Sequence, residues 1–235
     1  MPLLLWRLAE EIMTAEKVIY KELLREYPCL EPLPIWEAYE TLLECGEKNG
    51  KILVCGNGGS ASDAEHIVGE LMKGFRLKRE LTPEEKVSFS GLKEGERVAG
   101  RLQKAIRAIS LNSQTALLTA VGNDTDYDMV YAQQVYGYGE KGDVLIGITT
   151  SGNSSNVVNA AVTARALEMK VIGITGRGIS ALWEQSDICL RIPAEEIYRV
   201  QEYILPLYHG LCGMLEEALF GKSNWGAVKA GCIRR

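Results

Sequence analysis

Apolar and polar positions follow two periods along this chain, one typical of strands and one typical of helices. Short continuous apolar runs, typical of strands buried on both faces, lie at 51–55, 105–111, 143–148, 170–175 and 188–192. Segments with one apolar face at the helical period lie at 3–20, 35–47, 61–73, 113–121, 128–136, 155–168, 179–185 and 194–220. The last of these helices contains Pro206, where it could bend.

The alternation of strands and helices predicts an α/β fold with three layers: a doubly wound, parallel, five-stranded sheet covered by helices on both faces. The 235 residues suit one such domain with appendages. We place an N-terminal helical segment at 1–34, the main domain at 35–220 and a C-terminal tail at 221–235. The charged stretch 76–103 contains no strand pattern, and we expect one or two short surface helices there, either solvated or shaping the binding pocket.

Composition narrows the class of protein. The 26 Lys and Arg against 31 Asp and Glu give a net charge of −5, which argues against binding nucleic acid through bulk electrostatics. The six cysteines include no C-x-x-C pair, so we expect reduced, mostly buried thiols in a cytoplasmic protein. Because no apolar run reaches membrane-spanning length and no signal peptide is apparent, we expect no membrane partner.

Two loops at strand ends are suited to holding an anion. The first, Gly56-Asn57-Gly58-Gly59-Ser60, joins a strand to a helix, although a tight turn capped by serine explains it equally well. The second runs from Thr149 to Ser154 and has four hydroxyl side chains, those of Thr149, Thr150, Ser151 and Ser154. One hydroxyl would suffice as a helix cap, so four favour a cradle for a phosphate monoester. Neither loop contains Lys or Arg, which favours a sugar phosphate over a nucleotide.

The two histidines of the chain are each spaced to share a helix face with a second polar residue. His66 precedes Glu70 by four residues, and Gln201 precedes His209 by eight. Two imidazoles, a carboxylate and an amide oxygen can coordinate zinc. A histidine on a helix is more often structural, however, so the spacing alone leaves both interpretations open.

Several motifs in fixed order resemble the sugar isomerase (SIS) superfamily and, within it, the phosphoheptose isomerase group. The resemblance covers roughly residues 35 to 217 and rests on 55–60, 63–66 with Glu70, 121–124, 142–148, 150–154, 171–176, 187–193 and 199–202 with His209. Two positions depart from the bacterial pattern: Tyr198 stands where Asp is frequent, and Gly74 stands where Arg is frequent. These departures bear on the choice of sugar more than on the type of reaction.

The resemblance implies a homotetramer of flavodoxin-like subunits that binds a phosphorylated sugar at subunit interfaces. It implies a Zn²⁺ ion held by His66, Glu70, Gln201 and His209. It also implies an aldose–ketose isomerisation in which we assign Glu70 as the base and His209 as the acid. The implied substrate-binding residues are Asn57, Gly58, Gly59, Ser60, Asn123, Asp124, Thr149, Thr150, Ser151, Ser154 and Gln201.

Two other functions remain open at this point. A different phosphosugar isomerase would use the same machinery, and a non-catalytic SIS protein that senses phosphosugars would keep the fold and the phosphate loops. The presence of all four metal-type residues favours an enzyme. A plain nucleotide-binding protein is disfavoured, because the chain has neither G-x-G-x-x-G after its first strand nor a P-loop.

Overall fold

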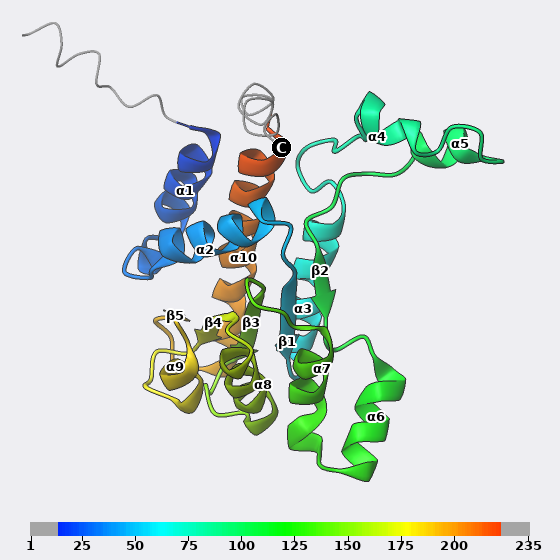
Figure 1. Ribbon diagram of the computed structural model, residues 1–235. Coiled ribbons are helices and arrows are strands. Elements are labelled where there is room, and N and C mark those ends of the chain that lie inside the picture. The colour runs from blue at the N-terminus through cyan, green and yellow to red at the C-terminus, as the bar shows by residue number, and fades with distance from the viewer. Residues whose placement is uncertain (1–13, 222–235) are drawn as a thin grey trace, which may run out of the picture.

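A parallel five-stranded sheet forms the centre of the computed structural model, which describes residues 14–221. The strand order is β2-β1-β3-β4-β5 (Figure 1). The strands are β1 (Ile52–Gly56), β2 (Ala108–Ser110), β3 (Val144–Thr149), β4 (Lys170–Thr175) and β5 (Ile188–Arg191). All neighbouring strands pair in parallel, which confirms the predicted fold class.

Helices cover both faces of the sheet, because successive strand residues point to opposite sides. In β1, Ile52 and Val54 join one core with α1, α2, α3 and α10, whereas Leu53 and Cys55 join a second core with α7, α8 and α9. The helices are α1 (Ala15–Glu26), α2 (Ile35–Glu47), α3 (Gly59–Met72), α4 (Pro83–Val87), α5 (Gly95–Ala99), α6 (Thr115–Asp124), α7 (Val130–Tyr138), α8 (Ser155–Ala166), α9 (Ala181–Gln185) and α10 (Ile197–Phe220), with short 3-10 turns η1 (Pro28–Leu30) and η2 (Tyr127–Met129).

The longest described helix, α10, packs against α1, α2 and α3 and continues through Pro206. A Cβ at Gly210 would lie 2.7 Å from a terminal methyl group of Leu23 on α1, so a larger residue there would have to displace that side chain. Burial of Leu23 and of Ile19 on α1 then ties the N-terminal segment to the main core. Within residues 14–221, no helix is long and apolar enough to cross a membrane.

Two predicted elements have different bounds in the structure. The predicted helix at 3–20 is described only from Ala15 and continues to Glu26, while its first residues lie outside the described part of the chain. The predicted strand at 105–111 is only Ala108–Ser110, because β2 is an edge strand that pairs with β1 alone. The remaining predicted strands and helices are confirmed, with shifts of a few residues at their ends.

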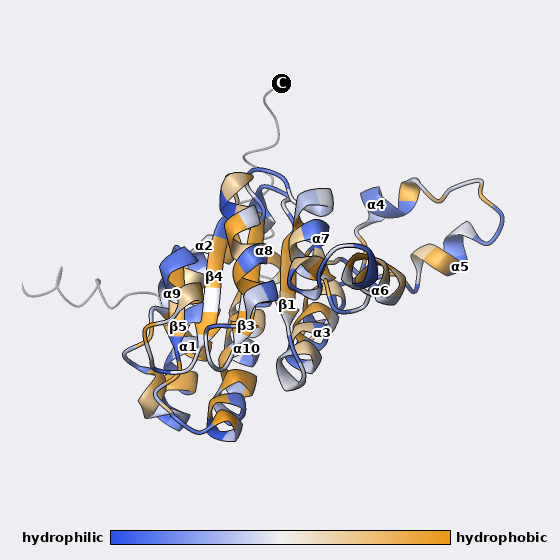
Figure 2. Ribbon diagram, turned by 90° about the horizontal axis from the view of Figure 1, so that it is seen from below, coloured by the Kyte–Doolittle hydropathy of each residue, from blue (hydrophilic) through white to orange (hydrophobic). Residues whose placement is uncertain are grey.

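Residues 76–103 form an arm that projects away from the sheet (Figures 1 and 2). Its two short helices, α4 and α5, confirm the predicted surface helices. The two chain segments at the start and end of the arm meet at an isolated antiparallel bridge between Glu80 and Gln103. Next to it, Lys104 N donates to Arg79 O at 2.6 Å. The arm leaves the body at the end of α3, on the side remote from α6, so within one chain it does not cover the strand-end loops (Figure 1).

Candidate active site

The first loop turns the chain sharply from β1 into α3. Gly58 has a φ of +57°, a conformation that favours glycine. A Cβ at Gly56 would lie 2.7 Å from both the Cβ and the carbonyl oxygen of Ser60, so the loop can close only around glycine. Helix α3 starts at Gly59, two residues earlier than predicted, and its first backbone N–H groups lie at the carboxyl edge of the sheet.

Asn57 joins this loop to the start of α8 through a reciprocal amide pair. Asn57 Nδ2 donates to Asn156 Oδ1 at 2.8 Å, and Asn156 Nδ2 donates back to Asn57 Oδ1 at 3.0 Å. The Tyr131 hydroxyl donates to the carbonyl of Gly56 at 2.6 Å and lies 3.2 Å from Asn57 Oδ1. The buried Asn156 and Tyr131 hold the two loops in a fixed relation, and sequence reasoning missed both.

Three of the four predicted hydroxyls of the second loop converge. Thr149 Oγ1 lies 2.9 Å from Ser154 Oγ and 3.3 Å from Ser151 Oγ. Thr149 is buried, whereas Ser151 is exposed, so the cluster opens outward from the end of β3. Gly152 has a φ of +72°, which lets the chain curl around the hydroxyls. A loop that presents several hydroxyls and a helix start to one point can bind a phosphate group.

The acid–base residues meet between α3 and α10. His66 Nε2 lies 3.2 Å from Glu70 Oε1, and the rings of His66 and His209 are 5.1 Å apart between centroids at an interplanar angle of 83°. The side chain of Glu70 is 13 % exposed and that of His66 is 43 % exposed, so the pair is open on one side. Burial lowers the pKa of His209 below its ordinary value; His66 adds to this shift, and Glu70 opposes it. His209 is therefore a neutral imidazole near pH 7.

Two further side chains hold these groups in place, and sequence reasoning missed both. The hydroxyl of buried Tyr208 lies 2.8 Å from His66 Nδ1, which leaves Nε2 of His66 facing Glu70. Lys73 Nζ lies 3.3 Å from Glu70 Oε2. Lys73 follows Glu70 at a helical spacing and could have been found from the sequence. Tyr208 could not, because it comes 142 residues after His66.

Gln201 reaches the first loop from the start of α10. A Cβ at Gly59 would overlap Nε2 of Gln201, so the amide lies directly against the first residue of α3. Gln201 therefore lies beside the predicted anion-binding backbone, and His209 lies two helical turns further along α10 beside His66. The two predicted pairs thus come together across two helices.

Substituting Gly59 by alanine is expected to displace Gln201 and lower kcat/KM for the sugar phosphate by about tenfold or more, because a small misplacement of a contacting group is costly. Gly69→Ala on the same helix is the matched control, since a Cβ there meets no atom within 4 Å. Steady-state kinetics and thermal melting of both variants measure the effect. Equal kcat/KM values for the two variants would mean that Gln201 has no role at the loop.

Asn123 and Asp124 stand apart from the other predicted residues. They end α6, where Asn123 Nδ2 donates to Asp124 Oδ1 at 2.8 Å and both side chains are exposed. Helix α6 packs on α7 and η2, and none of its residues is buried. Within one chain, the structure does not bring Asn123 and Asp124 to the histidine cluster.

The predicted zinc ligands are side chains of α3 and α10. Among residues 14–221, no three His, Cys, Asp or Glu side chains are gathered tightly enough to hold an ion by themselves. The Nε2 atom of His209 is nevertheless buried, and it has no hydrogen-bond partner in the described part of the chain. An unpaired buried nitrogen next to His66 and Glu70 fits a ligand that binds there, and the donor set suits zinc chemically.

The chain matches a known domain family. The SIS domain family model matches residues 20–99 and 96–176. The parallel sheet and its strand-end loops, together with this match, define an SIS-domain protein.

Similarity to named relatives shows which group of SIS-domain proteins this chain resembles. The chain is 38% identical over 209 residues to the phosphoheptose isomerase of Helicobacter pylori, covering 88% of this chain and 95% of that one. It is 40% identical over 194 residues to the phosphoheptose isomerase of Bordetella avium, covering 81% and 86%. A solved phosphoheptose isomerase structure from Francisella tularensis superimposes with a TM-score of 0.68 at 32% identity, covering 85% and 95%. The chain belongs to the phosphoheptose isomerase family.

Proposed function

We propose that this protein interconverts sedoheptulose 7-phosphate and D-glycero-D-manno-heptose 7-phosphate by aldose–ketose isomerisation. The observation that carries the proposal is the meeting of Glu70, His66 and His209 between α3, which starts at the first phosphate-type loop, and α10, whose Gln201 lies against that loop. The hydroxyls of Thr149, Ser151 and Ser154, with Ser60 and the N-terminus of α3, would bind the phosphate. Asn57 and Gln201 would contact the sugar.

The reaction requires one base and one acid. Glu70 takes a proton from C1 of the ketose while the C2 carbonyl oxygen gains a proton, which gives a cis-enediol. The same carboxylic acid then returns the proton to C2, and the O1 hydroxyl gives its proton to His209 as the aldehyde forms, which restores the neutral imidazole. His209 serves as the acid; a neutral imidazole can act in this role by donating its N–H to the carbonyl oxygen. Tyr208 and Lys73 keep His66 and Glu70 in place during both steps.

Incubation of the pure protein with sedoheptulose 7-phosphate in heavy water, followed by mass-resolved chromatography, tests the proposal. The expected result is a new aldoheptose 7-phosphate peak together with deuterium at the exchanged carbon. A panel of other ketose phosphates run in parallel identifies a different sugar if sedoheptulose 7-phosphate is not converted. Binding of a phosphosugar without any exchange would instead indicate a non-catalytic sensor.

We propose further that His66, Glu70, Gln201 and His209 hold a zinc ion, supported by the buried, unpaired Nε2 atom of His209. When bound, zinc supplies a Lewis acid that polarises the carbonyl oxygen. We expect about one zinc per chain after dialysis against trace zinc, and loss of that zinc with EDTA or in His209→Asn. Elemental analysis and the zinc-induced rise in melting temperature measure it. A melting temperature that zinc raises equally in His209→Asn would contradict this site.

We also propose that the protein is a homotetramer. Apolar side chains are exposed on several elements of residues 14–221, including those of Tyr127, Met129, Tyr136, Ile197 and Tyr198. Helix α6 contains Leu117, Leu118 and Val121, yet none of its residues is buried. Association of copies would cover such faces and could bring Asp124 of one copy to the site of another. Light scattering of the purified protein measures the assembly.

A further inference from the structure

The segment that follows α3 is wrapped around one buried carboxylate of α10. Glu216 accepts hydrogen bonds from the backbone N–H groups of Phe75, Arg76 and Leu77 at 2.8, 2.6 and 3.0 Å. It also accepts one from Arg79 Nε at 2.7 Å, and the side chains of Arg79 and Glu216 are both fully buried. The start of the arm is therefore anchored on the same helix as Gln201 and His209.

Arg79 uses its other nitrogens to hold the end of α3. Its two terminal nitrogens, Nη1 and Nη2, donate to Leu71 O at 2.6 Å and to Glu70 O at 3.0 Å, respectively. Carbonyls in the last turn of a helix lack partners within the helix, so the guanidinium supplies them. One rigid, planar group thus connects Glu216 of α10 with the backbone of Glu70 itself.

The position of this connection along the helices matters for the chemistry. Glu216 follows His209 by seven residues, which places it two turns further on the same face of α10. The connection therefore lies directly beyond the cluster formed by His66, Glu70 and His209. The charge-assisted hydrogen bonds of Arg79 add fixed directions and distances to the packing of α3 against α10.

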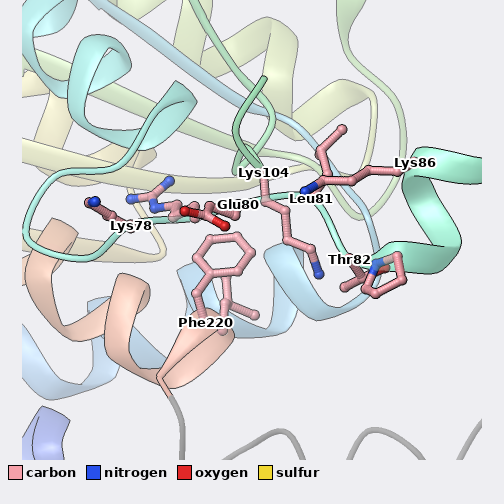
Figure 3. Close-up of a pocket in the computed structure, with 10 residues that line it drawn as sticks. Lys78, Glu80, Leu81, Thr82, Lys86, Lys104 and Phe220 are labelled. Carbon is pink, nitrogen blue, oxygen red and sulfur yellow. The ribbon is translucent and has the colours of Figure 1, made fainter. Parts of the chain in front are cut away.

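An aromatic ring covers one face of the connection. The ring of Phe220 lies under the guanidinium of Arg79, 4.8 Å from ring centroid to Cζ. Figure 3 shows Phe220 beside Lys78 and Glu80, at the wall of a cavity of about 640 Å³ between the arm and the end of α10. A buried ion pair is seldom the most stable way to fill a core, so its use here favours a role in placing the groups that it joins.

We propose that Arg79 and Glu216 are positioning residues for the isomerisation: they set the distance between Glu70 on α3 and His209 on α10. This inference rests on the proposed function of the site. The start of the arm is then more than a solvated insertion, because its residues help to fix the position of Glu70, the catalytic base. Both side chains are fully buried, so in this proposal they act through the backbone of Glu70 and the position of α10.

Arg79→Met is the first test, with Lys51→Met as the matched control. Lys51 Nζ forms a largely buried pair with Asp143 at 2.9 Å at the amino edge of the sheet. Asp143 also accepts from two backbone N–H groups, those of Lys51 and Glu140, so both substitutions remove the cation from a carboxylate that keeps backbone partners. Both variants are expected to melt at lower temperature. Arg79→Lys retains the buried charge but cannot bond both Glu216 and the carbonyl groups at the end of α3. It replaces Arg79→Met in the test if that variant does not fold.

The readouts are kcat, KM and the primary deuterium isotope effect with sedoheptulose 7-phosphate deuterated at C1. In the Arg79 variants we expect kcat to fall by about 30- to 100-fold with KM within threefold, because the base is displaced relative to C1. The isotope effect is expected to rise as proton transfer becomes rate-limiting, whereas a mere loss of folded enzyme would leave it unchanged. Lys51→Met is expected to keep the wild-type kcat per folded molecule and the wild-type isotope effect.

Two results overturn the inference in distinguishable ways. If the wild type is active and the Arg79 variants match Lys51→Met in kcat and isotope effect, the pair is structural only. If the wild type converts no sedoheptulose 7-phosphate, the proposed function is wrong and the positioning role falls with it.

Discussion

Substitution of Glu70 by glutamine is expected to lower kcat by about 10³-fold, because a positioned general base contributes rate factors of this order. Glutamine keeps the shape and a hydrogen bond to His66 but cannot accept a proton from carbon. Substrate binding should persist, since the hydroxyl loop lies between β3 and α8, and the first loop lies at the opposite end of α3 from Glu70. Steady-state kinetics gives the rate, and calorimetric titration with sedoheptulose 7-phosphate gives the affinity.

Glu65→Gln provides the control for Glu70→Gln. Glu65 also lies on α3 and is exposed, and it accepts a hydrogen bond from Ser113 Oγ at 3.0 Å rather than from the histidine cluster. Its activity and deuterium uptake should equal those of the wild type. Deuterium incorporation at the wild-type rate in Glu70→Gln would show that another group removes the carbon-bound proton.

Local patterns account for how much of the fold could be predicted. The helix at 35–47 and the strand at 170–175 have the predicted bounds. The apolar pattern is unbroken along each element, and each ends at a turn or loop. The strand at 105–111 was drawn too long, since hydropathy does not reveal that an edge strand pairs on one side only. The start of α3 was drawn too late, because the turn is already complete at Gly58.

For the site, the sequence revealed pairs within one helix but not contacts between helices. Helical spacing predicted that His66 and Glu70 share one face of a helix, and that Gln201 and His209 share one face of another. In the structure these two faces, on α3 and α10, pack together. Tyr208 and the pair of Arg79 with Glu216 depend on α3 packing against α10, so residues more than 130 positions apart become neighbours. Asn123 and Asp124 were predicted from the resemblance, and the fold of one chain leaves them at an exposed helix end.

A negative charge introduced at Ser154 in the second loop is expected to weaken binding of the substrate phosphate strongly. Ser154 Oγ lies 2.9 Å from Thr149 Oγ1 at the start of α8, where the proposed phosphate would approach. A carboxylate about 4 Å from one phosphate charge costs about 4 kcal/mol near a protein surface. Solvent and salt reduce this, so Ser154→Asp should raise KM for the sugar phosphate by about 10²- to 10³-fold relative to a neutral side chain of equal size.

Ser154→Asn is that neutral comparison. Aspartate and asparagine have nearly the same volume, and both are favoured at the residue that precedes a helix, so neither should lower the melting temperature through loss of the cap. Any difference between them therefore reports charge rather than shape. The Ki of inorganic phosphate, measured for both variants at low and high salt, isolates the phosphate group from the sugar. A smaller gap at high salt follows from screening of the added charge. Equal Ki values for Asp and Asn would place the phosphate elsewhere, and the hydroxyls of Thr149, Ser151 and Ser154 would then act only as the turn that starts α8.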